Sequence, residues 1–349
     1  MASLFGPGGH ACPDAPALAS PERARFRLRH SADVDEHAAQ LSAWDQEYDQ
    51  LSSGRFAGRV RELWLDGPRL QVFHEHTSQE TSQQCAPWQG SVWFGLPDLR
   101  CQQPLHFCGH AQDAQRGHAL LSARASDGFA LRTPADFGIY GVVLDQTWLQ
   151  EQADALGLKL SPRLDRPAQA TPLSASRHAE LCQTLETLLS LAQSGDAQQR
   201  WGQATLQALL TQLLQGLCGD LAEAGPSPAQ RASQRRLALV MAARELARQP
   251  SGEALSVDAL CQQLHLTRRT LQNHFQSVLG ESPADFLKSV RLNACRRRLR
   301  EPSAPDKVQD VAAQWGFFHM GHFSQDYKDL FGELPSQTLR QRAPSHGHA

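Results

Sequence analysis

The pattern of apolar and polar positions changes character near residue 145. Before it, apolar and polar residues alternate in short segments such as Arg59–Leu65 and Leu70–His74, which flank a turn at Asp66-Gly67. Alternation interrupted by turn residues predicts antiparallel strands. Further strands are expected at Ser91–Leu96, Ala119–Arg124, Phe129–Arg132 and Phe137–Leu144, and a helix at Val34–Gln50. We therefore expect residues 25–145 to form a strand-rich, ligand-sensing domain, folded as a cupin-like barrel.

From residue 146 to residue 224 the apolar positions follow a helical period. Leucines recur at steps of three and four residues in Leu206, Leu209, Leu210, Leu213, Leu214 and Leu217. Such a stripe either packs on the chain's own barrel or forms the seam of a dimer. We predict a helical dimerisation region and a homodimer. The Pro/Gly-rich segment that follows predicts a linker over residues 225–232.

The last third of the chain, residues 233–342, contains two helix–turn–helix patterns. We name Val257–Leu279 unit one and Val308–Leu330 unit two, and a helix over Pro283–Arg300 connects them. A rod of that length can hold two recognition helices about 34 Å apart, one turn of B-DNA. The whole chain is therefore expected to be an α+β protein that ends in an all-α double helix–turn–helix domain.

The second helix of unit one carries an apolar face and a polar face. Its polar face contains Arg268, Arg269, Gln272 and Asn273, and Thr267 is placed to cap its start. Arginine can donate two hydrogen bonds to guanine, and glutamine or asparagine can pair with adenine. These four residues are therefore candidates for reading base edges.

Unit two offers a different set of side chains. Phe317 and Phe318 are expected to anchor its turn, and the candidate base readers are Met320, Gly321, His322 and Gln325. Because Gly321 has no side chain to offer, unit two is expected to contribute less direct readout. Candidate phosphate contacts are Arg296, Arg297, Arg298 and Arg300 on the connecting helix and Lys328 in unit two.

Residues 233–342 resemble the AraC/XylS family of bacterial transcription activators. The resemblance is carried by Leu260–Leu264, Arg269–Phe275, Gly280, Pro283, Arg291–Ala294, Val311–Phe317, His322–Lys328, Phe331, Gly332 and Pro335. It implies that Arg269, Gln272 and Asn273 read bases in unit one, and that the partners are double-stranded promoter DNA and RNA polymerase.

The N-terminal part resembles a narrower group, the regulators of ethanolamine-utilisation operons. The matching residues are Asp33–Ala38, Trp44, Tyr48–Leu51, Gly54–Phe56, Gln71–Phe73, Val92–Pro97 and Gly141–Leu144. This resemblance implies activation in response to ethanolamine, with adenosylcobalamin as a possible effector. An AraC-type regulator of another catabolic operon, with a different inducer, is the alternative.

Charge is distributed unevenly along the chain. The total is near neutral, with 34 Lys+Arg and 36 Asp+Glu. Residues 1–228 carry 17 basic and 25 acidic residues, a net charge of −8, whereas residues 229–349 carry 17 and 11, a net charge of +6. A basic C-terminal part attached to an acidic sensor fits a polyanionic partner such as DNA.

Composition also excludes some classes of protein. Mean hydropathy is −0.44, and apolar runs are far shorter than the ~20 residues that span a membrane. Residues 1–24 and 343–349 are predicted to be a disordered leader and tail without an export signal. The eight cysteines form no CxxC pair. We expect them to be reduced and the protein to be cytoplasmic.

Other chemistry is weakly indicated. Trp88, Trp93 and Phe94 either line a ligand pocket or belong to the barrel core, and His106, Cys108 and His110 either bind a soft metal or form a polar strand. Because no paired ligand motif and no catalytic motif is present, we expect no metal, no resident cofactor and no enzyme activity. A cupin-like binding protein or metal enzyme tethered to a helix–turn–helix domain is the alternative from another class.

Overall fold

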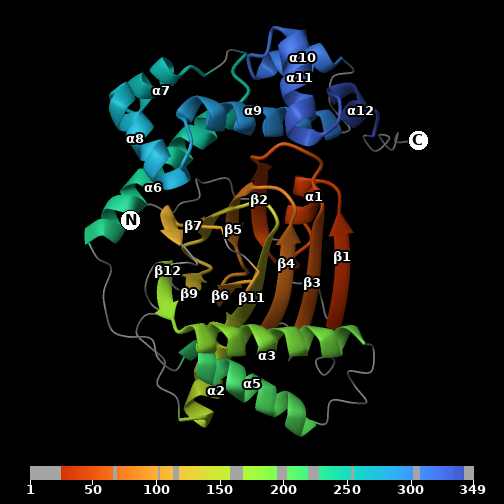
Figure 1. The fold of residues 1–349 in the computed structure, drawn as a ribbon, viewed down its shortest axis with the longest axis vertical. Helices are drawn as coiled ribbons and strands as arrows, with labels where there is room; N and C mark the ends of the chain where they lie inside the picture. The colour runs from red at the N-terminus through yellow and green to blue at the C-terminus, as the bar shows by residue number, and fades with distance from the viewer. Residues whose placement is uncertain are drawn as a thin grey trace.

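The computed structural model describes residues 25–65, 69–100, 103–112, 118–157, 168–194, 203–218, 228–252, 255–301 and 307–341. The predicted leader and tail lie outside these ranges, as does the start of the predicted linker. Figure 1 shows the strands in the middle, helices α3 and α5 below them, and the C-terminal helices above them.

Twelve strands lie in the first half of the described chain. They are β1 Arg25–Ser31, β2 Asp45–Gln50, β3 Gly58–Leu65, β4 Leu70–Thr77, β5 Thr81–Ala86, β6 Ser91–Pro97, β7 Leu105–Phe107, β8 His110–Gln112, β9 His118–Arg124, β10 Phe129–Thr133, β11 Phe137–Asp145 and β12 Gln169–Leu173. They pair in two sheets, of order β1-β3-β4-β11-β6-β9-β12 and β2-β5-β10-β7-β8. The strand-rich domain is confirmed, but the closed barrel is not, because among the described residues both sheets end in edge strands.

The helices surround these sheets at two ends. They are α1 Val34–Ala38, α2 Gln146–Ala155, α3 Ala175–Gln193, α5 Gln203–Cys218, α6 Pro228–Arg248, α7 Val257–Gln263, α8 Arg268–Leu279, α9 Pro283–Arg300, α10 Val308–Gln314, α11 Met320–Phe331 and α12 Pro335–Arg340. Helix α6 begins inside the predicted linker, and β12 lies inside the segment that we expected to be helical throughout.

The predicted helix over Val34–Gln50 is wrong in its second half. Helix α1 ends at Ala38, Ala43 has a φ of 62°, and Asp45–Gln50 form strand β2. A left-handed φ at a non-glycine residue ends any helix, so the chain turns there and enters the sheet. The turn places β2 where it can contact the C-terminal domain.

Two hydrophobic layers flank the seven-stranded sheet. One face packs against α2, α3 and α5 through buried residues that include Leu63, Val72 and Phe94. Leu213, Leu214 and Leu217 of the predicted leucine stripe are buried in this same layer. For these three leucines the structure supports packing on the chain's own sheet, whereas a dimer seam stays a prediction.

The other face of the sheet holds an aromatic core. Gly95 of β6 lies opposite Gly141 of β11, and a Cβ at Gly141 would lie 2.0 Å from the ring of Phe73. The paired glycines therefore leave room for aromatic rings between the two sheets. There Trp93 stacks on Phe129 with ring centroids 4.1 Å apart.

Candidate DNA-binding interface

Helix α8 of unit one has clear signals at both ends. The Thr267 hydroxyl accepts a hydrogen bond from the Thr270 amide at 3.2 Å, and Gly280 closes the helix with a φ of 71°. Its buried face consists of Leu271, Phe275, Val278 and Leu279. These contacts fix which side of α8 faces outward.

The outward side of α8 presents the predicted base readers together. Arg268, Arg269, Gln272 and Asn273 are all exposed. Arg268 lies 3.8 Å from Asp258, but both side chains are 70% exposed, so this ion pair holds the guanidinium weakly. The structure thus brings the four predicted residues onto one accessible helix, with donors and acceptors suited to base edges.

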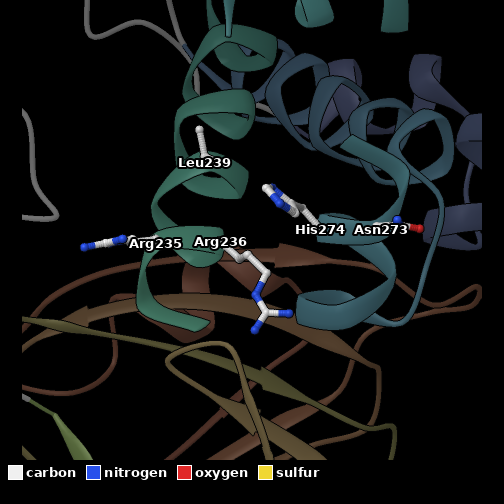
Figure 2. A pocket seen from close by; sticks show the side chains of 5 residues that line it. All are labelled: Arg235, Arg236, Leu239, Asn273 and His274. Atoms are coloured by element: carbon white, nitrogen blue, oxygen red, sulfur yellow. The ribbon is translucent and has the colours of Figure 1, made fainter. Parts of the chain in front are cut away.

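A basic groove lies between α6 and α8. It has a volume of about 480 Å³ and is lined by Arg235, Arg236, Leu239, Asn273 and His274. Figure 2 shows His274 pointing from α8 toward α6, whereas Arg235 extends away from α8. Burial and the nearby Arg236 lower the pKa of His274, so the positive charge here comes from the two arginines. We did not single out this Arg-Arg pair on α6 from the sequence.

Helix α11 of unit two begins without a side-chain cap. His319 occupies the N-cap position but makes no capping hydrogen bond. Gly321, His322 and Gln325 are exposed, as is Lys328, while Met320 is half-buried against the core of unit two. The amide of Gln325 donates to Asp329 at 2.7 Å. The predicted residues of unit two therefore lie on an accessible face, with few groups ready to bond a base.

The two phenylalanines before α11 do not share the anchoring role that we expected. Phe317 packs into the core of unit two, with its ring centroid 5.1 Å from that of Phe323. Phe318 is 63% exposed, so the prediction for this residue is wrong. Consecutive residues in an extended turn point to opposite sides, and one of them faces the solvent.

Arg297 on α9 is turned toward the N-terminal domain. Its guanidinium donates to Asp35 at 2.7 Å and to Asp49 at 2.8 Å, and lies 3.2 Å from Glu47. Burial opposes its charge, but the carboxylates of Asp49, Asp35 and Glu47 outweigh burial and raise its pKa. Burial also raises the pKa of Asp35 to about 6, against the effect of Arg297.

Arg296 and Arg300 meet the same domain at the start of α1. Arg296 donates to Asp33 at 2.8 Å and to Glu333 at 2.7 Å, and Arg300 lies 2.5 Å from Asp33. Arg298, by contrast, pairs with Glu301, the residue that directly follows α9. Three of the four α9 arginines predicted to contact phosphate are thus bound to carboxylates of the N-terminal domain, and phosphate contact by them would require these ion pairs to open.

Amide and backbone groups extend this contact between the domains. Asn293 of α9 accepts from the backbone N–H of Gln50 at 3.0 Å and donates to the Gln50 carbonyl at 2.9 Å. The Gln50 side chain donates to the carbonyl of Leu330 at 2.6 Å, and the Gly54 amide donates to the same carbonyl at 3.1 Å. Strand β2 and the loop after it therefore touch both α9 and the end of α11 (Figure 1).

The predicted ligand-pocket residues do not come together. Trp93 and Phe94 are neighbours on β6, so Trp93 faces the aromatic core while Phe94 faces the helical layer. Trp88 instead lies beside Trp64, with ring centroids 5.0 Å apart. These three side chains therefore do not line one pocket.

A second groove lies in the N-terminal domain, between α3 and the end of β6. It has a volume of about 650 Å³ and includes Asp98, Tyr140, Cys182 and Glu186. Its carboxylates already have partners, because Arg100 binds Asp98 at 2.8 Å and Arg61 binds Glu186 at 2.8 Å. This saturation leaves the groove little charge to offer a ligand.

The residues weighed as a soft-metal site form a turn. His106 is the middle residue of β7 and His110 begins β8, with Cys108 in the turn between the two strands at a φ of 48°. Burial, helped by Arg132, lowers the pKa of His106 to about 4. In the part of the chain that the structure describes, no three His, Cys, Asp or Glu side chains are placed to hold a metal ion.

None of the helices in the described part of the chain is long and apolar enough to cross a membrane.

Comparison with known proteins supports the interpretation of the C-terminal part. Residues 260–341 match the family of helix-turn-helix domains. The XylDLEGF operon transcriptional activator 3 of Pseudomonas putida is 35% identical over 91 residues, which are 26% of this chain and 28% of that protein. The probable thc operon regulatory protein of Rhodococcus erythropolis is 38% identical over 89 residues, which are 25% of this chain and 27% of that protein.

Comparison with solved structures also finds regulators. A transcriptional regulator with an AraC-type DNA-binding domain from Chromobacterium violaceum is 29% identical and covers 33% of this chain and 98% of its own, with a TM-score of 0.29. The chain spans just over a quarter of the length of the two curated relatives named above, so the likeness concerns one domain. Residues 260–341 are therefore similar to helix-turn-helix domains, in a chain that aligns over about a quarter of its length with operon regulators.

Proposed function

We propose that this protein is an AraC-type transcriptional activator that binds promoter DNA through both helix–turn–helix units. The single observation that carries the proposal is the accessible face of α8, where Arg268, Arg269, Gln272 and Asn273 stand side by side. The basic groove beside this helix adds positive charge for the phosphate backbone. A cytoplasmic homodimer that contacts RNA polymerase completes the proposal.

The N-terminal domain is proposed to control how the DNA-binding domain is held. Arg296, Arg297 and Arg300 of α9 connect it to carboxylates on α1 and β2. A ligand that binds better when these contacts are open would shift the population toward released chains, and one that prefers them closed would do the opposite. The arginines that we predicted as phosphate contacts would then act as the connection between sensing and DNA binding.

The inducer that we propose is ethanolamine, with adenosylcobalamin as a second effector. The proposal rests on the resemblance of Asp33–Ala38 and Tyr48–Leu51 to regulators of ethanolamine-utilisation operons. These are also the segments whose carboxylates bind α9. Calorimetric titration of the full chain with ethanolamine, with and without adenosylcobalamin, tests it. No heat in either titration would favour the alternative, an activator of another catabolic operon.

Selection from a random duplex library tests DNA binding without a known operator. The full chain is expected to enrich a motif with two half-sites one helical turn apart, and the affinity for it should fall as salt rises. An Arg269→Ala variant should lose about 1–3 kcal/mol of binding free energy and relax the preference at one base pair.

Arg177→Ala on α3 is the matched control, because this arginine also lies on a helix but far from both units in the fold. Its affinity and its selected motif should equal those of the unchanged chain. A library that shows no enriched motif contradicts the proposed function. A motif that Arg269→Ala still selects unchanged contradicts the role of Arg269.

A further inference from the structure

The two neighbouring phenylalanines Phe317 and Phe318 have opposite surroundings. Phe317 lies between Phe323 and the guanidinium of Arg291, which is 5.0 Å from its ring centroid. Phe318 is 63% exposed and has the highest exposure of the large apolar side chains in the described chain. A single exposed apolar residue needs no explanation by itself. Phe318, however, lies two residues before the N-terminus of α11, and the N-terminal residues of a recognition helix are those that contact base edges in the major groove.

Gly321 provides a second, independent observation at the same end of α11. It lies in the first turn of the helix, where alanine is the better helix former. A Cβ added at Gly321 would meet nothing within 4 Å, so no contact inside the chain requires a glycine here. The missing side chain instead leaves open space on the outside of the helix, where another molecule's surface can come close to the backbone.

The surrounding side chains show which chemistry this end of α11 can recognise. Met320 is half-buried against the core of unit two, and His322 is exposed beside Gly321. Unlike α8, the first turn of α11 carries no arginine, glutamine or asparagine, and the amide of Gln325, one turn further along, already donates to Asp329. Its largest accessible group is the aromatic ring of Phe318. In the major groove of B-DNA, the apolar group that a protein can contact is the C5-methyl of thymine.

We propose that unit two recognises thymine C5-methyl groups through the exposed ring of Phe318, and that Gly321 lets the start of α11 come close enough for this contact. The inference rests on the proposed function and deepens it, since it assigns a different mode of readout to each unit. Unit one reads by hydrogen bonds, and unit two reads by apolar contact.

Uracil-substituted DNA tests this inference, because uracil differs from thymine only by the missing methyl group. The operator obtained by selection is made with uracil in place of thymine, either in the half-site of unit two or in that of unit one. The full chain should lose about fourfold in affinity for each methyl removed from the unit-two half-site. Removal of methyl groups from the unit-one half-site should change the affinity by less than about twofold.

Two variants separate the contact from a general loss of binding. Phe318→Ala should weaken binding to thymine DNA and make the chain indifferent to uracil in the unit-two half-site. Gly321→Ala should raise the midpoint of thermal unfolding, because alanine favours the helix, and yet weaken DNA binding. Leu334→Ala, which removes a side chain 41% exposed in the same domain, is the matched control and should bind both DNAs like the unchanged chain.

The outcomes distinguish this inference from the proposed function. Tight DNA binding that ignores uracil in both half-sites overturns the thymine contact and leaves the proposed function standing. The same holds if Phe318→Ala remains sensitive to uracil. If the full chain binds no duplex at all, the proposed function fails and this inference fails with it.

Discussion

Unit one shares a hydrophobic core with the N-terminal domain, in addition to an ion pair between Arg132 and Glu281, whereas unit two has a core of its own. The core of unit one, with Leu271 and Phe275, belongs to one hydrophobic cluster that also contains Trp44 and Phe129 of the N-terminal domain. Unit two has a separate cluster, built from α9, α10 and α11. The N-terminal domain reaches the C-terminal half of α9 and the end of α11 through ion pairs and hydrogen bonds.

This difference separates a contact that changes little with solution conditions from one that responds to them. Apolar burial is non-directional and carries no charge, so neither pH nor moderate salt alters it much. Charged hydrogen bonds depend on geometry and on protonation, and they are strong only while both partners are in place. A change that disrupts polar contacts is therefore expected to release α9 and unit two before it releases unit one.

The largest expected effect comes from removing a carboxylate that holds α9. Asp49 is fully buried and accepts hydrogen bonds from Arg244 at 2.7 Å and Arg297 at 2.8 Å. Asp49→Asn would leave the buried guanidinium of Arg244 and the half-buried guanidinium of Arg297 without this charge, at a cost of about 3–5 kcal/mol in the free energy of unfolding. Urea unfolding of the full chain measures this loss.

Asp127→Asn is the control for the Asp49 substitution. Asp127 pairs with Arg124, but both side chains are about one third exposed, and the expected change is at most about 1 kcal/mol. If Asp49→Asn costs no more than this control, the polar contacts do not hold α9, and the contrast between the two units disappears.

A smaller effect is expected from pH. In the structure the C-terminal domain is docked on the N-terminal domain. In this docked arrangement burial raises the pKa of Asp35 to about 6 and that of Glu281 to about 7, although Arg297 and Arg132 favour the charged carboxylates. A carboxyl group with a higher pKa in the docked state than in the released state stabilises docking at low pH. This stabilisation is lost as the pH rises through the pKa of the docked state. Docking should therefore weaken between about pH 5 and pH 7.5, by roughly tenfold in its equilibrium constant for Asp35 alone and by more when Glu281 is included.

Other carboxylates at the same contact act outside this range. The pKa of Asp49 and that of Asp33 are lowered overall because arginines outweigh their burial, so their contribution is lost only in more acidic solution. Small-angle scattering of the full chain across pH 5 to 7.5 measures the released fraction. Glu281→Gln, which stays neutral, should flatten the profile, and stronger docking at pH 7.5 than at pH 5 would contradict the prediction.

The smallest expected effect compares the starts of the two recognition helices. Thr267→Ala removes the capping hydrogen bond of α8 and should lower the free energy of unfolding by about 1 kcal/mol. His319→Ala removes a residue that makes no such bond, so its effect should stay below about 0.5 kcal/mol. Equal losses in thermal unfolding would show that α11 depends on its first residue as much as α8 does.

Local signals predicted the helices of the C-terminal domain well. Thr267 and Gly280 mark the two ends of α8, and Pro283 marks the start of α9, as the structure confirms. The expected helix over Val34–Gln50 failed because the spacing of four between Trp44 and Tyr48 fits the period of a strand as well as that of a helix. This spacing alone does not distinguish a helix from a strand, whereas the left-handed turn at Ala43 does.

The direction of the α9 side chains could not be predicted from the sequence. Arg296 and Arg297 stand in an arginine-rich run, which is typical of a phosphate contact. Their carboxylate partners Asp33, Asp35 and Asp49 lie between 248 and 263 residues away in the chain. Contacts over such separations depend on how two domains pack, and neither periodicity nor local charge reports that.

The reciprocal hydrogen bonds between Asn293 and Gln50 have a further consequence. Strand β2 is the last strand on its side of the five-stranded sheet, and its backbone would otherwise offer unpaired groups to another chain. The Asn293 amide satisfies one donor and one acceptor there, as the next strand of a ladder would. Every event that frees α9 therefore also exposes the unpaired backbone groups of an edge strand, so that release of α9 and the risk of aggregation rise together.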